Sequence, residues 1–411
     1  MSYRGQEPCS EISTTAGRIF KIIRDYGPLS GTEIVRHTGL AKSTVSAHLD
    51  RLREVGLLRE EENGGGKRHK LKVAESAGYV VGIALGQSHV RVALCDLEAE
   101  IIDSEGGAVD LLRSSPEEIL NQIINFTREL ERRAGLSHSS LFGVGIGLPC
   151  PVDYQKGIPV NPPVMPGWDR FPVAAFLKNE FTCPVFVDND VNVMALAERD
   201  KGGCDTEGRE SFILVKTGTG VGAGIVIEGQ IYRGAKGAAG DIGHIGLEGD
   251  TRLCRCGNIG CLEMAAGGRA LRALGEAAAS EGRSSFLAEE LASGKVVDAS
   301  LIARGAASGD EECIRLLSYS GSCVGEVLAK IVNFFNPSLI IISGGLTKLG
   351  DRFIASIRES IYRRSTPLAT VDLIVKKSSL LEQGGTIGAA ILVLDEVFSH
   401  GNVHRLMQRS N

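Results

Sequence analysis

The chain has 411 residues, of which 43% are hydrophobic and 5% aromatic, and its formal net charge is −5. This length and apolar content predict two or three compact domains with a sizeable core. The N-terminus is polar, unlike a signal peptide, and no apolar run approaches the ~20 residues that a membrane span requires, so we expect a cytoplasmic protein without a membrane partner. Ten cysteines scattered through so long a chain indicate reduced thiols, not a secreted disulfide framework.

The charge is unevenly divided along the sequence. Residues 1–72 hold 13 Lys and Arg against 9 Asp and Glu, a balance of +4, which leaves −9 for the remainder. A basic end joined to an acidic body indicates that only the N-terminal part meets phosphates.

The basic end has the pattern of a winged helix-turn-helix. A first helix is predicted over residues 15–26 from the spacing of its apolar residues. Ser30 is the expected N-cap of a second helix, with Glu33 as its capping-box partner, and Gly39 makes the following turn. A third helix is predicted over about 41–55.

The third helix is the expected recognition helix. Small polar and basic side chains on its outward face can meet base edges and phosphates in a major groove. Residues 57–59 and 69–73 alternate as two strands, and the glycine-rich basic tip between them, 63–68, is the expected wing. The alternative is a three-helix packing module whose charges only face solvent. The candidate DNA-contacting residues are Lys42, Ser43, Thr44, Ser46, His48, Lys67 and Arg68.

Beyond residue 79 the pattern changes to buried strands that alternate with helices. Residues 79–85 and 90–96 predict a hairpin, and the serine, proline and two acids at 115–118 are typical of a helix N-terminus. Further strands are predicted at 143–147 and 185–188, and a second series begins near Phe212. Strands and helices alternating in two halves predict a two-lobed α/β fold with a cleft between the lobes.

Two glycine-rich loops follow strands of the second half. The strand at 212–216 leads into a loop whose backbone amides could cradle an anion. The apolar strand at 339–342 runs directly into a serine and a glycine pair. The candidate nucleotide-like loop residues are Gly218, Thr219, Gly220, Gly344 and Gly345.

Three cysteines lie close together around two glycines, with one histidine upstream. Cys254, Cys256 and Cys261 supply three thiols, and His244 lies ten residues before the first of them. These are four ligands at the spacing that a tetrahedral Cys3His zinc site needs. Because the set suggests no open coordination position, we expect a structural Zn²⁺ that fixes the loop.

These motifs together resemble the ROK family of repressors, open reading frames and sugar kinases. The resemblance covers about residues 79–398. It rests on the first glycine loop, the Gly-His-Ile turn at 243–245, the cysteine motif, the Asp-Asn-Asp-Val-Asn segment at 188–192, and the Ser-Gly-Gly at 343–345.

The resemblance implies a domain organisation. Its body is an actin/hexokinase-like, ribonuclease H-like pair of lobes, and the winged helix at 1–74 is the extension seen in the repressor branch. The first lobe would comprise residues 79–196 and a C-terminal helix at about 382–398. The second lobe, 197–381, would carry the zinc site.

The resemblance also implies a sugar site in the cleft. Carried over by position, its ligand-binding residues are Asn189, Asp190, Asp241, His244 and Glu263. Sugar hydroxyls need carboxylates and amides held rigidly, and the metal would supply that rigidity, with one ring nitrogen of His244 on the metal and the other on a hydroxyl or a second acceptor. The alternative role for Asp190 is a helix N-cap, and for Asp241 and Glu263 it is that of solvated loop acids.

Catalysis depends on residues 84–88, which read Ala-Leu-Gly-Gln-Ser. Kinases of the family carry Asp-x-Gly-Gly-Thr there, and the aspartate organises magnesium. Its replacement by Ala84 should remove most phosphoryl transfer, so we expect no catalytic residue, and Asp190, the base of kinase relatives, would be vestigial. Asp241 in place of a glutamate and Val164 in place of an asparagine leave the identity of the sugar open.

The sequence therefore predicts a sugar-responsive DNA-binding transcriptional regulator, a repressor of carbohydrate-metabolism genes. Its expected partners are operator DNA, a sugar or sugar-derivative effector, and further copies of itself, because two half-sites on DNA lie about one turn, ~34 Å, apart and call for a homodimer or homotetramer. The alternative is an active ATP-dependent, glucokinase-like sugar kinase with an attached DNA-binding module. A third possibility is a DNA-bound scaffold that answers to a protein partner.

Overall fold

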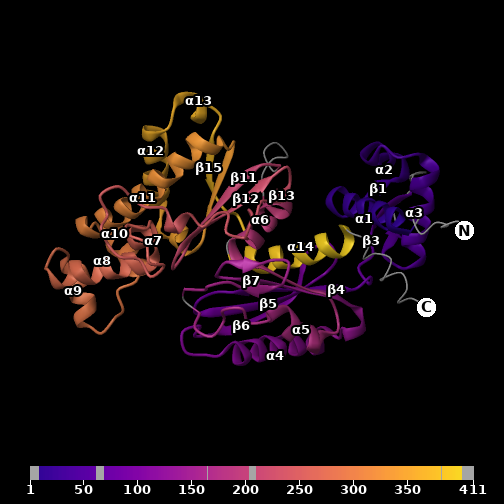
Figure 1. The fold of residues 1–411 in the computed structure, drawn as a ribbon, viewed down its shortest axis with the longest axis horizontal. Coiled ribbons are helices and arrows are strands. Elements are labelled where there is room, and N and C mark those ends of the chain that lie inside the picture. Colours follow the sequence, from indigo (N-terminus) through magenta and orange to yellow (C-terminus); the bar gives the residue numbers. More distant parts are fainter. Residues whose placement is uncertain (1–8, 62–68, 164, 203–209, 381, 400–411) are drawn as a thin grey trace, which may run out of the picture. The chain divides into compact units, whose positions relative to one another are not determined.

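The computed structural model describes residues 9–61, 69–163, 165–202, 210–380 and 382–399 (Figure 1). Its contacts divide the chain into two compact units. The first comprises Met1–Leu196 and Gly385–Asn411, and the second comprises Ala197–Gly384. Within the described residues, no helix is both long enough and apolar enough to cross a membrane.

The first unit begins with the winged helix-turn-helix, as predicted. The capping box between Ser30 and Glu33 is present, and Gly39 ends the second helix in the left-handed conformation with φ of 69°. A two-residue strand that the sequence analysis missed pairs with the returning wing strand. The helices are α1 (Cys9–Tyr26), α2 (Gly31–Thr38) and α3 (Lys42–Glu54), and the sheet order is β1 (Leu29–Ser30), β3 (Lys70–Val73), β2 (Leu58–Glu60).

The rest of the first unit is built on a five-stranded mixed sheet. The hairpin predicted from 79–96 forms its antiparallel side, and the strands predicted near 143–147 and 185–188 run parallel to the first strand of that hairpin. The sheet order is β10 (Val185–Asn189), β7 (Leu141–Leu148), β4 (Tyr79–Leu85), β5 (His89–Cys95), β6 (Ile101–Ala108). A small hairpin, β8 (Val152–Asp153) with β9 (Ile158–Pro159), follows β7.

Helices cover both faces of this sheet (Figure 1). One face packs on α4 (Pro116–Ala134), which begins at the expected serine, proline and acids and has a capping box there, and on α5 (Val173–Phe181). The other face carries α14 (Gly384–Ser399), and α6 (Asp190–Lys201) follows β10. A Cβ atom on Gly82 or Gly145 would lie within 2.1 Å of a carbonyl oxygen of α14, so glycines at these two strand positions allow the helix to lie directly on the backbone of the sheet.

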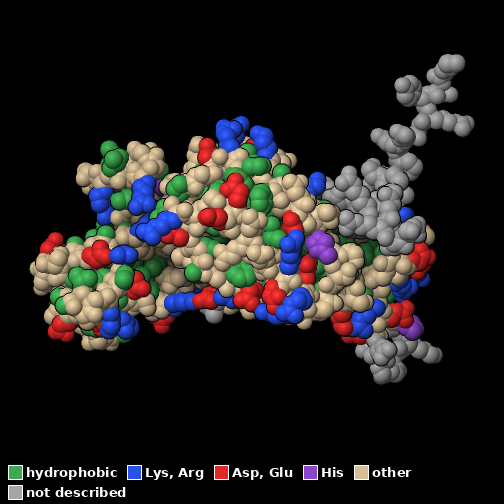
Figure 2. Space-filling model, turned by 90° about the horizontal axis from the view of Figure 1, so that it is seen from below, with side chains coloured by type: hydrophobic (Ala, Val, Ile, Leu, Met, Phe, Trp, Pro, Cys, Tyr) green, Lys and Arg blue, Asp and Glu red, His purple; other side chains and the backbone are tan. Residues whose placement is uncertain are grey.

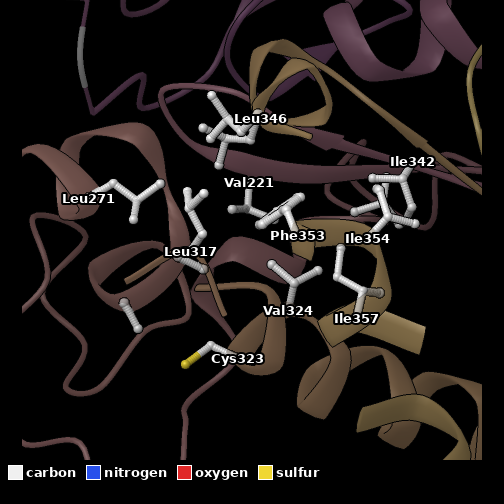
Figure 3. Close-up of a cluster of buried hydrophobic side chains, with 14 of the residues drawn as sticks. Val221, Leu271, Leu317, Cys323, Val324, Ile342, Leu346, Phe353, Ile354 and Ile357 are labelled. Atoms are coloured by element: carbon white, nitrogen blue, oxygen red, sulfur yellow. The ribbon is translucent and has the colours of Figure 1, made fainter. Parts of the chain in front are cut away.

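The second unit also has a five-stranded sheet. Its order is β13 (Gln230–Ile231), β12 (Val221–Ile227), β11 (Phe212–Thr217), β14 (Leu339–Ser343), β15 (Ile374–Lys377), and β11 is parallel to β14. The core in Figure 3 joins this sheet to the helices through side chains such as Val221, Ile342 and Phe353. The helices of this unit are α7 (Glu263–Ala266), α8 (Gly268–Ser280), α9 (Ser285–Ala292), α10 (Ala299–Ala307), α11 (Glu311–Phe335), α12 (Asp351–Arg364) and α13 (Pro367–Thr370), with 3₁₀ turns at Ile242–His244 and Gly345–Leu349. A further 3₁₀ turn, His138–Ser140, belongs to the first unit.

Candidate functional site

The recognition helix α3 exposes four of the five residues that the sequence analysis singled out on it. Lys42, Ser43, Thr44 and Ser46 are exposed. His48 is only 8% exposed, and burial, followed by the charge of Arg51, lowers the pKa of its imidazole. The prediction that His48 faces outward is therefore wrong.

The buried stripe of α3 explains this error. Val45, Leu49 and Leu52 face the core, and position 48 lies on the same side of a helix with 3.6 residues per turn. The opposite side carries Ala47 and Asp50, which are both exposed. The sequence analysis missed these two residues because it chose polar side chains near the start of the helix and did not measure their angular distance from the buried stripe.

An open groove of about 510 Å³ lies between α2, α3 and the base of the wing. The groove is lined by the side chains of Thr32, Arg36, Lys42, Ser46 and His69, among others. Cationic and hydroxyl groups together can bind phosphate oxygens of a DNA backbone. The wing residues Lys67 and Arg68 lie outside the described residues.

Figure 2 shows one side of the molecule with the side chains coloured by type. Acidic and basic side chains are interspersed across that face in the described residues. In the winged helix, the groove adjoins the exposed polar face of α3.

The second unit brings the four expected metal ligands together. The ligand atoms of His244, Cys254, Cys256 and Cys261 all lie within 4.8 Å of one another. Cys254 Sγ is 3.6 Å from His244 Nδ1, and the Sγ atoms of Cys256 and Cys261 are also 3.6 Å apart. A tetrahedral zinc ion, with bonds of ~2.1 Å to nitrogen and ~2.3 Å to sulfur, places neighbouring ligand atoms about 3.6–3.8 Å apart, so the cluster fits such an ion.

The loop that presents the cysteines depends on close backbone packing. Cys254 N donates to Asn258 O at 2.8 Å, which closes a tight turn that begins at the first thiol and contains the second. Gly260 has φ of 73°, and a Cβ atom on it would lie 2.5 Å from Asp250 O. A larger residue at position 260 would open the turn that delivers Cys261.

The three sugar-site candidates of the second unit lie against this metal cluster. Nδ1 of His244 lies 3.6 Å from Cys254 Sγ, and its Nε2 atom lies 3.8 Å from Asp241 Oδ1, so the two ring nitrogens face different side chains. Burial raises the pKa of the Asp241 carboxyl; His244 opposes this effect and Glu263 adds to it. The three side chains therefore interact electrostatically.

Glu263 is held by several contacts and is not a solvated loop acid. Its carboxylate accepts from Arg269 Nη2 at 2.5 Å and from the Val221 amide at 3.3 Å. A Cβ atom on Gly220 would lie 2.3 Å from Glu263 Oε2. The first glycine loop therefore packs on the acid that follows the last cysteine.

The two glycine loops lie side by side, because β11 and β14 are parallel and both end there. Thr217 Oγ1 donates to Ser343 O at 3.0 Å, and a Cβ atom on Gly344, whose φ is 93°, would lie 2.4 Å from Thr217 O. Two amides of the first loop are already used, since Gly218 N donates to Gly220 O and Val221 N to Glu263. Only part of this loop is therefore available to cradle an anion.

The first unit holds the other two sugar-site candidates at the junction of β10 and α6. Asn189 caps the helix, since its Oδ1 accepts from the Val191 amide at 2.9 Å, and its Nδ2 donates to Cys150 O at 3.0 Å. The N-cap role considered for Asp190 thus belongs to its neighbour. Asp190 is 8% exposed, and after burial its charge is the second cause that raises the pKa of the Cys150 thiol.

Comparison with known proteins bears directly on this arrangement. The model of the ROK family matches residues 80–396, and that of the arsR family of bacterial regulatory proteins matches residues 15–60. The chain belongs to the ROK family.

Two individual relatives match nearly the whole chain. A putative xylose repressor of Caldicellulosiruptor sp. strain Rt8B.4 is 30% identical over 93% of this chain and 95% of its own length. The crystal structure of a ROK transcriptional regulator, a homologue of E. coli Mlc, has a TM-score of 0.83 at 25% identity and covers 97% of this chain and 99% of its own. A glucokinase of Halalkalibacterium halodurans is also 30% identical, but over 77% of this chain and 94% of its own length.

In this ROK chain the position of the kinase aspartate is part of a helix contact. A Cβ atom on Gly385, in the first turn of α14, would lie 2.8 Å from the Cβ atom of Ala84 on β4. The side chain at position 84 is therefore directed at the N-terminus of α14, and the described structure has a methyl group there instead of a carboxylate.

Proposed function

We propose that this ROK protein is a sugar-responsive DNA-binding transcriptional repressor of carbohydrate-metabolism genes. The observation that carries the proposal is that one chain joins a recognition helix with an exposed polar face to a ROK body, and that the match to a putative xylose repressor runs through both. The glucokinase match covers a smaller share of the chain.

On DNA, the exposed face of α3 would enter the major groove. Ser43, Ala47 and Asp50 would face base edges, where a methyl group can contact thymine and a carboxylate can accept from cytosine N4. Arg36 and Lys42 in the adjoining groove would bind phosphates, together with Lys67 and Arg68 of the wing. His48 is not part of this surface.

In the ROK body, the proposed ligand is a sugar held by Asn189, Asp190, Asp241, His244 and Glu263. A structural Zn²⁺ bound by His244, Cys254, Cys256 and Cys261 would fix the loop from which Glu263 and His244 reach the ligand. The proposed domains remain 1–74, 79–196 with the C-terminal helix, and 197–381. A homodimer or homotetramer would present two recognition helices to two half-sites.

The second candidate function is that of a working ATP-dependent sugar kinase. The adjacent glycine loops and the buried Asp190 favour it. Ala84 opposes it, because no carboxylate stands at that position to organise magnesium.

Selection of operator DNA by the full chain tests the first proposal. A pool of random duplexes should yield a recurring motif with two half-sites, and a protein with Lys42→Ala and Ser43→Ala should not retain that motif. Recovery of no common motif by the wild-type chain, or the same motif from the double variant, would contradict the assignment of α3 as the recognition helix.

A further inference from the structure

The C-terminal half of α14 is attached to the first helix of the DNA-binding domain. Asp395 accepts from Lys21 Nζ at 3.2 Å and from Arg24 Nη2 at 3.1 Å. The side chain of Arg24 is only 5% exposed. Phe398, one turn further on, stacks on Phe20 with ring centroids 4.2 Å apart. A half-buried ion pair and an aromatic stack therefore join α14 to α1.

The next residue of α14 contacts a different element. Glu396 accepts from the hydroxyl of Tyr154 at 2.6 Å. Tyr154 lies in the turn of the β8–β9 hairpin. Because successive side chains on a helix point about 100° apart, Asp395 and Glu396 allow one rigid element to contact α1 and the hairpin at the same level.

The other end of the hairpin meets a proposed ligand residue. Cys150, directly before Pro151 and β8, accepts from the side-chain amide of Asn189 at 3.0 Å. Val160 N donates to Pro151 O at 2.9 Å and closes the base of the hairpin. The side chain of Asn189 thus contacts the backbone directly before the hairpin, and Tyr154 in the turn of the same hairpin contacts α14.

A cavity of about 230 Å³ lies beside this segment. It is lined by Tyr154, Lys156, Ala174, Phe186 and Glu396, among others. The turn is therefore not packed on all sides, and it has room to change position without displacing the core of the sheet.

We propose that the β8–β9 hairpin and α14 couple the proposed sugar site to the DNA-binding domain. The route runs from Asn189 through Cys150 to Tyr154, then through Glu396 and Asp395 to α1, which packs on α3. This inference rests on the proposed function, because it assigns a regulatory role to contacts between its two sites. A ligand that changes the hydrogen bonding of Asn189 biases the hairpin, and α14 transmits that bias to α1.

Coupling is reciprocal, so operator DNA must also affect the hairpin. The test is hydrogen–deuterium exchange of the full chain with and without a duplex selected on the protein itself. In the wild type, we expect the duplex to slow exchange in α3 and, by at least about 3-fold, in residues 150–159. In Tyr154→Phe and Asp395→Asn, the effect on 150–159 should disappear while protection of α3 remains.

Tyr362→Phe is the matched control, since the Tyr362 hydroxyl donates to Leu373 O at 3.0 Å in the second unit. This variant should behave like the wild type. Protection of α3 with no change at 150–159 in the wild type, or an unchanged effect in both test variants, would overturn the coupling alone. Absence of protection in α3 would overturn the proposed function and the coupling with it.

Discussion

The carboxylate of Glu263 occupies the space that a side chain on Gly220 would need, with 2.3 Å between Oε2 and the position of such a Cβ atom. Gly220→Ala should displace Glu263 from Arg269 and from the Val221 amide and destabilise the second unit by about 1–3 kcal/mol. Thermal unfolding would show this as a lower melting temperature.

Gly345→Ala is the control for that substitution, because a Cβ atom there meets nothing within 4 Å. It should melt within about a degree of the wild type. Equal melting temperatures for Gly220→Ala and the wild type would mean that the contact between loop and acid contributes nothing.

Metal content tests the cysteine cluster. Cys261→Ser should lose most of the bound metal and lower the melting temperature, because Cys261 is buried and its loop also positions Glu263. Elemental analysis of the purified protein measures the loss. Cys323→Ser, at a buried thiol outside the cluster, should keep one zinc per chain. Equal zinc in both variants would contradict the site.

Lys42→Ala should weaken operator binding about 5–10-fold and reduce the slope of log affinity against log salt by ~1, as expected for loss of one phosphate contact. Fluorescence anisotropy at several salt concentrations measures both quantities. Glu54→Ala, an exposed change at the far end of α3, serves as the control and should leave the slope unchanged. An unaltered slope in Lys42→Ala would remove Lys42 from the phosphate-binding surface.

Burial of His48 predicts a pH dependence of the winged helix. The folded-state pKa of the His48 imidazole is lowered from 6.5, so the unfolded state binds the proton more readily. The free energy of unfolding is therefore highest above about pH 6.5 and falls as the pH drops below that value. Hydrogen exchange of α3, corrected for intrinsic rates, should show this fall in the wild type and a smaller one in His48→Gln. His69→Gln, at a side chain that is 76% exposed, should keep the wild-type dependence. The reverse result for the two variants would contradict the assignment of the effect to His48.

Because residue 84 is an alanine, we expect the protein not to transfer phosphate from ATP to a sugar. The wild type should release no ADP above background with ATP, magnesium and glucose or xylose. Ala84→Asp should fold, because its carboxylate would face the N-terminus of α14, where negative charge is favourable. Steady ADP release by the wild type in a coupled assay would support the kinase alternative instead.

Local signals in the sequence were sufficient for much of the fold. The capping-box partners Ser30 and Glu33 lie three residues apart and predicted the start of α2, and the serine, proline and acids at 115–118 predicted that of α4. Strand β1 was missed because two residues are too few to show alternation. The outward placement of His48 failed because a polar side chain was assumed to face solvent, although its spacing from Val45 and Leu52 places it on the buried stripe.

The candidate site was predictable where its residues share one motif. The four metal ligands lie within 18 residues of sequence, and the structure brings them together. The contact of Asp395 with Arg24 joins residues that are 371 positions apart, and neither local periodicity nor the motif could indicate it. The same holds for the bond between Tyr154 and Glu396.

Operator affinity in the presence of sugars tests the central claim most directly. Anisotropy titrations of the selected duplex should be run with D-xylose, D-glucose, N-acetylglucosamine and their phosphates. We expect at least one of these to change the affinity by about 5-fold or more in the wild type, and Asp190→Asn to lose that response while binding the duplex equally well without sugar. An affinity that is the same with every sugar would contradict the account.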